Sequence, residues 1–221
     1  MAASRVGGTE RRAASGATSR VRLALFIGLA AAAAAGCVRR PPERPDASMS
    51  TEMAPDFAQS VPLNVAVLPA VNTTGREVTI IRSFREYAKE ALVERWYSPI
   101  AFTAIDSRVG PRERFTPFDL DRLRGTFEED AILACTLSQW DASTLRKDHK
   151  VLAGGEFSLY NSKTGKRLWS VSFSDYWVPV DAGPRQIPAE DFYEYEQRAM
   201  RSFVQRFFAE FPKRASSAAQ G

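Results

Sequence analysis

The chain has 221 residues, and its formal net charge of +4 comes from its first 36 residues. These hold five of the 30 Lys and Arg residues and one of the 26 Asp and Glu residues, so 25 of each remain. A nucleic-acid-binding surface needs clustered basic residues, and no basic run follows residue 36, so no nucleic-acid partner is expected. The remaining length suits one domain, and the 44% hydrophobic content suffices for a core.

Residues 1–36 have the pattern of a secretory signal peptide. An apolar run, Leu23–Ala35, follows a leader with five arginines and precedes Cys37. Its 13 residues are too few for a membrane-spanning helix, which needs about 20. Cleavage before Cys37 is the favoured prediction. An uncleaved anchor flanked by Arg39–Arg40 and an ordinary secretion signal with an incidental cysteine are the alternatives.

The composition divides the rest of the chain into three parts. Residues 37–60 are rich in Pro, Ser and charge and have no apolar period, which predicts a flexible tether behind Cys37. Residues 61–212 form the predicted globular domain, and residues 213–221 form a predicted disordered tail.

The first half of the domain alternates predicted strands and helices. The apolar run 63–70 predicts a buried strand. A helix follows over 78–96, with Thr73 or Thr74 as a candidate cap. Residues 100–105 predict a second strand and 116–125 a short helix. The apolar positions assigned to the first helix are Ile80, Ile81, Phe84, Tyr87, Ala88, Ala91, Leu92 and Trp96.

The second half predicts three strands and a final helix. Residues 130–140 form one strand, and 151–161 and 166–177 form a hairpin with a bulge or bend at Gly154–Gly155. Residues 188–211 carry an aromatic stripe at helical spacing, which is expected to face the core. The order β-α-β-α-β-β-β-α predicts an α/β fold, a mixed sheet with packed helices.

The residues that carry chemistry do not form a recognisable catalytic or metal-binding pattern. The one histidine, His149, lies in the polar segment RKDHK and is expected to be solvated. Cys135 lies in a strand-like run and is expected to be a small buried hydrophobe without a disulfide partner. Asp119 and Asp121 suit a helix N-terminus and Glu128–Asp130 a solvated loop. No metal, cofactor or enzymatic activity is expected; a small envelope hydrolase using carboxylates or His149 is the alternative.

Tyr176 and Trp177 precede a loop that is rich in Pro and Gly. Tyr and Trp are enriched in protein interfaces, so these two residues are a candidate partner contact. The segment 175–188 can equally fold back as a lid on the core, and both interpretations stay open.

Several segments together resemble an uncharacterised family of bacterial envelope lipoproteins, which is similar to CsgG, to the amino-terminal domain of TolB and to LpoB. The matching segments are Ala34–Cys37, which resembles a lipobox, VAVLPAVNTTG, RWYSPIAFTAID, EEDAILACTLSQW and FSLYNSKTGKRLWSVSF. Ala34 stands where that lipobox usually has Leu, and the pair of long strands that forms the pore of CsgG has no counterpart. The matching motifs are structural, so Cys37 is the only functional residue carried over.

The resemblance implies cleavage after Gly36, a lipid on Cys37 and a periplasmic α/β domain without enzymatic activity. Val38 in place of Asp favours the outer membrane by analogy with enteric bacteria. The expected role is therefore a lipid-anchored binding or assembly protein of the envelope that faces the periplasm. An accessory subunit of a peptidoglycan synthase or of a secretion apparatus is an alternative. The expected partners are the membrane and an envelope protein, and self-association stays open.

Overall fold

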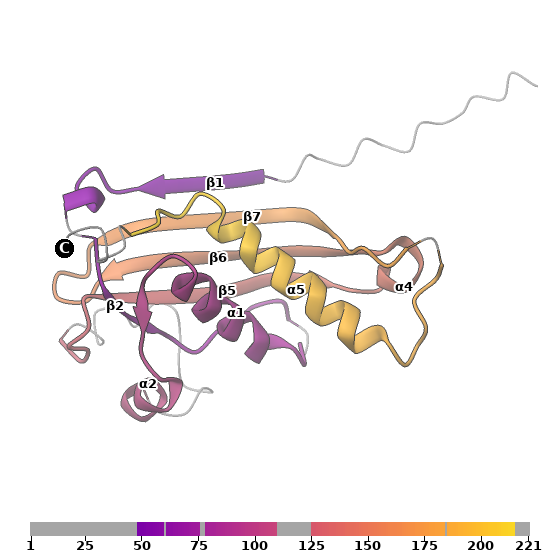
Figure 1. The fold of residues 1–221 in the computed structure, drawn as a ribbon, viewed down its shortest axis with the longest axis horizontal. Coiled ribbons are helices and arrows are strands. Elements are labelled where there is room, and N and C mark those ends of the chain that lie inside the picture. The colour runs from indigo at the N-terminus through magenta and orange to yellow at the C-terminus, as the bar shows by residue number, and fades with distance from the viewer. Residues whose placement is uncertain (1–47, 60, 76–77, 110–124, 184, 215–221) are drawn as a thin grey trace, which may run out of the picture. The chain divides into compact units, whose positions relative to one another are not determined.

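The computed structural model describes residues 48–59, 61–75, 78–109, 125–183 and 185–214, which lie in one compact unit. They form a mixed sheet with helices packed on it, so the predicted α/β class is confirmed (Figure 1). The strands are β1 (Ser48–Met53), β2 (Asn64–Val67), β3 (Val71–Asn72), β4 (Ser98–Pro99), β5 (Ala131–Asp141), β6 (Lys150–Asn161) and β7 (Arg167–Pro179). The helices are the 3-10 helix η1 (Phe57–Gln59) and the α-helices α1 (Ile81–Val93), α2 (Phe102–Val109), α4 (Leu145–Asp148) and α5 (Phe192–Phe208).

The sheet of the described residues has the strand order β1-β7-β6-β5-β2-β4, and β3 also pairs with β5. β2 is parallel to both β4 and β5, whereas β5, β6, β7 and β1 pair antiparallel. The predicted hairpin is therefore confirmed. Both ladders of β6 shift register near Gly154 and Gly155, which confirms the predicted bulge. A Cβ on Gly155 would lie 2.6 Å from the Thr136 carbonyl oxygen, so this close approach of two strands requires glycine.

α1 and α5 lie on the same side of the sheet (Figure 1). The aromatic stripe of α5 is buried as predicted, with Phe203 and Phe207 at most 1% exposed. Phe207 packs edge-on against Phe173 of β7 and Phe157 of β6, with ring centroids 4.7 and 4.6 Å apart. Burying one such side chain contributes roughly 1.5–3 kcal/mol, so this contact between α5 and the hairpin is a main source of stability.

The start of α1 differs from the prediction. Ile80 occupies its N-cap without a side-chain hydrogen bond, so neither Thr73 nor Thr74 caps the helix. The backbone and hydroxyl of Thr74 donate instead to Asn72 Oδ1, at 3.0 and 2.7 Å. Thr74 therefore belongs to a local Asx turn with Asn72, and α1 begins several residues later.

The predicted strand over 100–105 is wrong, because only Ser98–Pro99 pairs in the sheet and the following residues form α2. The Ala101 carbonyl accepts hydrogen bonds from the Ala104 and Ile105 amides. Ile105 is buried in a small second cluster that also contains Leu68 and Phe127. A short apolar run is compatible with the period of a strand and with that of a helix, and the packing of Ile105 favours the helix here. Residues 116–124 of the helix predicted over 116–125 lie outside the described residues.

The predicted tether, residues 37–60, is wrong in its second half. Residues 48–53 form β1, which pairs antiparallel with β7 from Ser48 to Met53, and Phe57 is buried in the core. Only Met49 of β1 is packed against the core, so the strand is formed mainly by backbone pairing to the edge of β7. Such pairing leaves little hydrophobic pattern in the sequence, and residues 48–59 therefore belong to the folded part although the predicted domain began at residue 61.

The predicted tail boundary also shifts slightly. The Arg214 amide donates to the Arg95 carbonyl at 3.1 Å, so residues 213 and 214 belong to the folded part. Residues 215–221 and the predicted signal peptide lie outside the described residues. Within the described ranges, no helix has both the length and the apolar character needed to cross a membrane.

Candidate interaction site

The C-terminal end of α1 holds a tryptophan in an unfavourable backbone conformation. The Trp96 amide donates to the Val93 carbonyl at 3.0 Å and the Tyr97 amide to the Leu92 carbonyl at 3.1 Å. This pair of hydrogen bonds is a Schellman motif, in which the residue at the position of Trp96 is left-handed and usually glycine. Trp96 indeed has φ of +67°, and its side chain is 61% exposed. The helix therefore ends with a strained backbone that directs a large aromatic side chain to the surface.

Two further exposed apolar side chains belong to residues at this end of α1 and beside β4. Val93 is 54% exposed and Leu63 is 42% exposed. The Trp96 amide bonds to the Val93 carbonyl, and the Ser98 amide, two residues after Trp96, donates to the Leu63 carbonyl at 2.9 Å. We call Leu63, Val93 and Trp96 the apolar corner. It lies where α1 ends and β4 forms the edge of the sheet.

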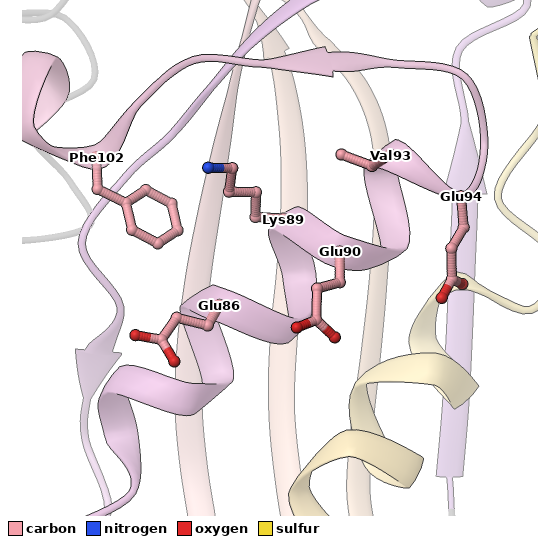
Figure 2. Close-up of a pocket in the computed structure, with 6 residues that line it drawn as sticks. All are labelled: Glu86, Lys89, Glu90, Val93, Glu94 and Phe102. Atoms are coloured by element: carbon pink, nitrogen blue, oxygen red, sulfur yellow. The ribbon is translucent and has the colours of Figure 1, made fainter.

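A shallow hollow of about 530 Å³ adjoins the apolar corner along the outer side of α1. We call it the α1 groove. It shares Val93 with the corner, and the ring of Phe102 from the start of α2 lies across from the helix (Figure 2). Residues three and four apart on a helix lie on one side, which explains how α1 supplies the other lining residues. The full lining is Glu86, Lys89, Glu90, Val93, Glu94 and Phe102.

Arg85 fixes the position of α2 and of Phe102 beneath the groove. Its side chain is buried, and its Nε and Nη2 donate to the Val67 carbonyl at the end of β2, at 3.0 and 2.7 Å. Its Nη1 lies 2.7 Å from Asp106 of α2, and its guanidinium lies 4.0 Å from the Phe102 ring centroid. One buried cation thus links β2, α1 and α2, and this role accounts for its burial.

The predicted lipidation site, Cys37, and the predicted cleavage position at Gly36 lie outside the described residues, as do Asp119 and Asp121. Lipidation and cleavage therefore stay predictions.

Tyr176 and Trp177, the predicted partner contact, both lie in β7. Tyr176 is half-buried on the core side, where its ring stacks on Phe203 with centroids 6.1 Å apart. Trp177 is half-buried on the opposite side of the sheet, because successive strand residues alternate, and the Lys150 ammonium lies 4.8 Å from its ring centroid. The strand thus places the two rings on different faces, and the partner contact by Tyr176 and Trp177 stays a prediction.

His149 is not a solvated loop residue as predicted. It is half-buried at the C-cap of α4 with φ of +52°, and its amide donates to the Leu145 carbonyl at 3.0 Å. The carbonyl of His149 accepts from the Val180 amide at 2.8 Å, so the backbone of this residue joins two segments. These contacts give His149 a structural role.

The acidic segment 128–130 also has structural contacts. Asp130 accepts hydrogen bonds from the Leu63 and Asn64 amides at 2.8 and 3.0 Å, which fixes the start of β2. The backbone hydrogen bond from Asn64, and next to it the one from Leu63, hold the pKa of Asp130 below its usual value although partial burial acts in the opposite direction. Glu129 forms an ion pair with Arg108 at 2.9 Å. These carboxylates therefore connect β2, α2 and β5.

Cys135 is fully buried in β5, which confirms the prediction of a small buried side chain. Burial raises the pKa of its thiol to about 12, although the charge of Arg85 acts in the opposite direction. A thiol in this environment is a poor nucleophile. Within the described residues, no three His, Cys, Asp or Glu side chains come together as metal ligands.

Sequence reasoning missed both the apolar corner and the α1 groove. It assigned Trp96 to the apolar side of the helix, whereas the structure exposes this residue. One signal was available: the helix ends in Arg95-Trp96-Tyr97-Ser98-Pro99, with no Gly or Asn at the position where helices commonly become left-handed.

No protein-family model and no curated protein matches the chain. Solved structures with partial similarity to the chain include the following three. The PelC dodecamer from Paraburkholderia phytofirmans has 15% identity and a TM-score of 0.48 and covers 76% of this chain and 99% of that one. Lipoprotein GNA1162 from Neisseria meningitidis has 16% identity and a TM-score of 0.43 and covers 65% of this chain and 99% of that one. The LpoB C-terminal domain from Salmonella enterica has 11% identity and a TM-score of 0.36 and covers 53% of this chain and 82% of that one.

Similarity at this level assigns no activity or partner to the chain. The likeness to CsgG and to TolB stays an expectation from the sequence motifs.

Proposed function

We propose that this protein is a lipid-anchored protein of the bacterial outer membrane that faces the periplasm and works by binding a partner protein, without catalysis. The observation that carries the binding role is Trp96. An exposed tryptophan, 61% accessible, occupies a left-handed position where glycine would be less strained. Strained residues of this kind are concentrated at functional sites.

The apolar corner has the properties of an interface centre. Tryptophan is enriched among the residues that contribute most to binding, and such residues sit in apolar surroundings. The hydrogen bonds of the Schellman motif fix the backbone of Trp96, so little backbone entropy is lost when a partner covers the ring.

The sequence supports the anchor. Cleavage before Cys37 and acylation of its sulfur and new amino group would provide more than one acyl chain, which is what stable anchoring requires. Because β1 begins at residue 48, eleven residues, 37–47, run from Cys37 to the start of β1 in the sequence. Eleven residues span at most about 40 Å, so a lipid on Cys37 would keep the start of β1 within about that distance of the membrane surface.

Metabolic labelling tests the anchor. A clickable palmitate should label the wild-type chain, and Cys37→Ser should abolish the label and release the protein from the outer-membrane fraction. Equal labelling of both chains contradicts lipidation.

Photo-crosslinking in cells tests the binding role. A benzoylphenylalanine introduced at position 96 should give one discrete adduct. The same group at position 193 should give none, because Tyr193 is equally exposed, at 61%, but lies on α5 away from the corner. Adducts of equal yield at both positions, or none at position 96, overturn the proposal.

A further inference from the structure

We infer that the α1 groove binds a cationic segment of the partner, namely a peptide stretch with an apolar side chain flanked by Lys or Arg. This inference rests on the proposed binding function and specifies the chemistry of the bound segment. It follows from the shape of the groove, from the fixed ring within it and from the charges along its rim.

The groove has a preformed apolar floor. Phe102 is half-buried, and two cations lie close to its ring, with the Arg85 guanidinium 4.0 Å and the Lys89 ammonium 5.0 Å from the ring centroid. Val93 forms the other apolar surface and is more than half exposed. An apolar side chain of a partner would bury both surfaces, and Trp96 follows Val93 by three residues and bonds to its carbonyl.

The six residues that line the groove carry an excess of negative charge. Three of its six lining residues are glutamates, and the one cation, Lys89, lies against Phe102. The three carboxylates follow one another along α1 at intervals of four residues (Figure 2). They are Glu86, Glu90 and Glu94.

The ion pairs at the rim leave these carboxylates available. Among the described residues, Glu86 has no ion-pair partner. Glu90 lies 3.2 Å from Arg201, but both side chains are about half exposed, and such pairs exchange at little cost. Glu94 lies 3.8 Å from Arg95, whose Nη1 donates to the Ala91 carbonyl at 3.1 Å. A cationic segment could therefore pair with all three carboxylates.

Charge complementarity decides between the candidate occupants. An anionic lipid surface would be repelled by a row of three carboxylates beside the apolar corner. A second copy of this chain would bring the same acidic row toward itself in a two-fold contact. A segment with Lys or Arg on both sides of an apolar residue matches the rim and the floor together, and opposite charges also accelerate the encounter.

Selection from a random display library of 12-residue peptides tests the inference on the full secreted chain carrying Cys37→Ser. The selected peptides should be enriched in Lys and Arg around one apolar residue. Binding of a selected peptide should weaken about three- to tenfold in Glu86→Gln/Glu94→Gln and should weaken further with added salt. The matched control, Glu128→Gln/Glu210→Gln, removes two exposed carboxylates outside the groove and should leave the affinity unchanged.

A second pair of variants tests the apolar floor. Val93→Ser should weaken the same peptide at least as much, whereas Tyr193→Ser, a matched exposed position on α5, should not. Melting curves identify any variant that fails to fold. Selected peptides that are neutral or acidic, or cationic peptides that bind Glu86→Gln/Glu94→Gln as well as the wild type, overturn the inference.

Two further experiments test the alternative occupants, a lipid surface and a second copy of this chain. Co-sedimentation of the chain with vesicles of 30% phosphatidylglycerol that depends on Val93 would assign the groove to lipid. A dimer in sedimentation equilibrium that Val93→Ser dissociates would assign it to a second copy. Either result overturns the cationic peptide. The proposed function fails separately, if the crosslink at position 96 is absent, whereas loss of peptide selectivity with that crosslink retained removes only this inference.

Discussion

The strain at Trp96 can be measured by comparing two substitutions at that position. Both Trp96→Ala and Trp96→Gly lose the buried part of the ring, about two fifths of the side chain. With 150–250 Å² for a fully buried aromatic side chain and about 25 cal/mol per Å², this loss costs at most about 1.5–2.5 kcal/mol in either variant. The two variants differ in the backbone, because alanine keeps the left-handed penalty of about 1–2 kcal/mol and glycine does not.

The informative result is therefore which of the two variants has the larger free energy of unfolding. In a right-handed helical position, glycine is less stable than alanine by about 0.5–1 kcal/mol. At Trp96 the left-handed penalty exceeds this cost, so Trp96→Gly should be more stable than Trp96→Ala by about 0.5–1 kcal/mol. Urea denaturation followed by circular dichroism measures this difference if the slopes agree.

A position on α5 provides the matched control. Tyr193 has the same exposed fraction as Trp96 but lies within a helix, so Tyr193→Ala should be more stable than Tyr193→Gly. If alanine is also the more stable residue at position 96, the backbone there is not strained, and the argument that Trp96 is placed for binding loses its basis.

Three further predictions concern the fold. Gly155→Ala should lower the free energy of unfolding by about 1–3 kcal/mol, because the new Cβ would lie 2.6 Å from the Thr136 carbonyl, and urea denaturation would measure it. Asp130→Asn should destabilise the protein at pH 7 and by progressively less below about pH 4. The folded-state pKa of Asp130 is lowered, so the stabilisation by its carboxylate is present above the unfolded-state pKa and is lost as pH falls through the folded-state pKa. Denaturation curves of the wild type and the variant at pH 7 and below about pH 4 test this. Cys135 should react with Ellman's reagent only at the rate of unfolding, because burial raises its pKa to about 12, and rapid labelling in native buffer would contradict that environment.

The central part of the fold could be predicted from local pattern. The β6–β7 hairpin has runs of strand-forming residues joined by a short turn, and the α5 stripe has a clear helical period. These elements bury one whole side, so the spacing of their apolar residues indicates which side faces the core.

The elements that were predicted wrongly are those in which tertiary contacts decide the structure. β1 buries little beyond Met49 and depends on the free edge of β7, which lies more than 100 residues later in the chain. α2 forms where a strand was expected, because Ile105 packs into the second cluster. Neither contact is encoded in a local period, so neither could be deduced from these segments taken separately.

The candidate site could not be predicted for a related reason. The α1 groove requires Phe102 to lie beside α1, and that position depends on the buried Arg85 and its contacts with Val67 and Asp106. The sequence shows an arginine on an otherwise apolar side of a helix, but it does not show which carbonyl and which carboxylate this arginine meets. The exposure of Trp96 likewise depends on where the helix ends.

Comparison of the left-handed residues separates Trp96 from the others. The part of the chain that the structure describes has seven such residues, and four of them are glycines, for which this conformation has no steric cost. Asp175 is of a type that tolerates it, and its side chain and amide both bond to Gln139, at 3.2 and 3.1 Å. The amide and carbonyl of His149 both form backbone hydrogen bonds that tie α4 and β6 to the chain around them.

Trp96 has no such compensation from its side chain. In the described part of the chain, its indole forms no hydrogen bond and no ring contact, and most of it is exposed. The Schellman hydrogen bonds would form equally well with glycine at this position, so they do not account for the choice of residue. A large apolar side chain on a strained, hydrogen-bonded helix end adds nothing to the isolated domain that glycine would not provide, apart from partial burial of its ring. Its benefit is therefore expected in the complex, where a partner would cover the ring and the free energy of binding would offset the backbone strain.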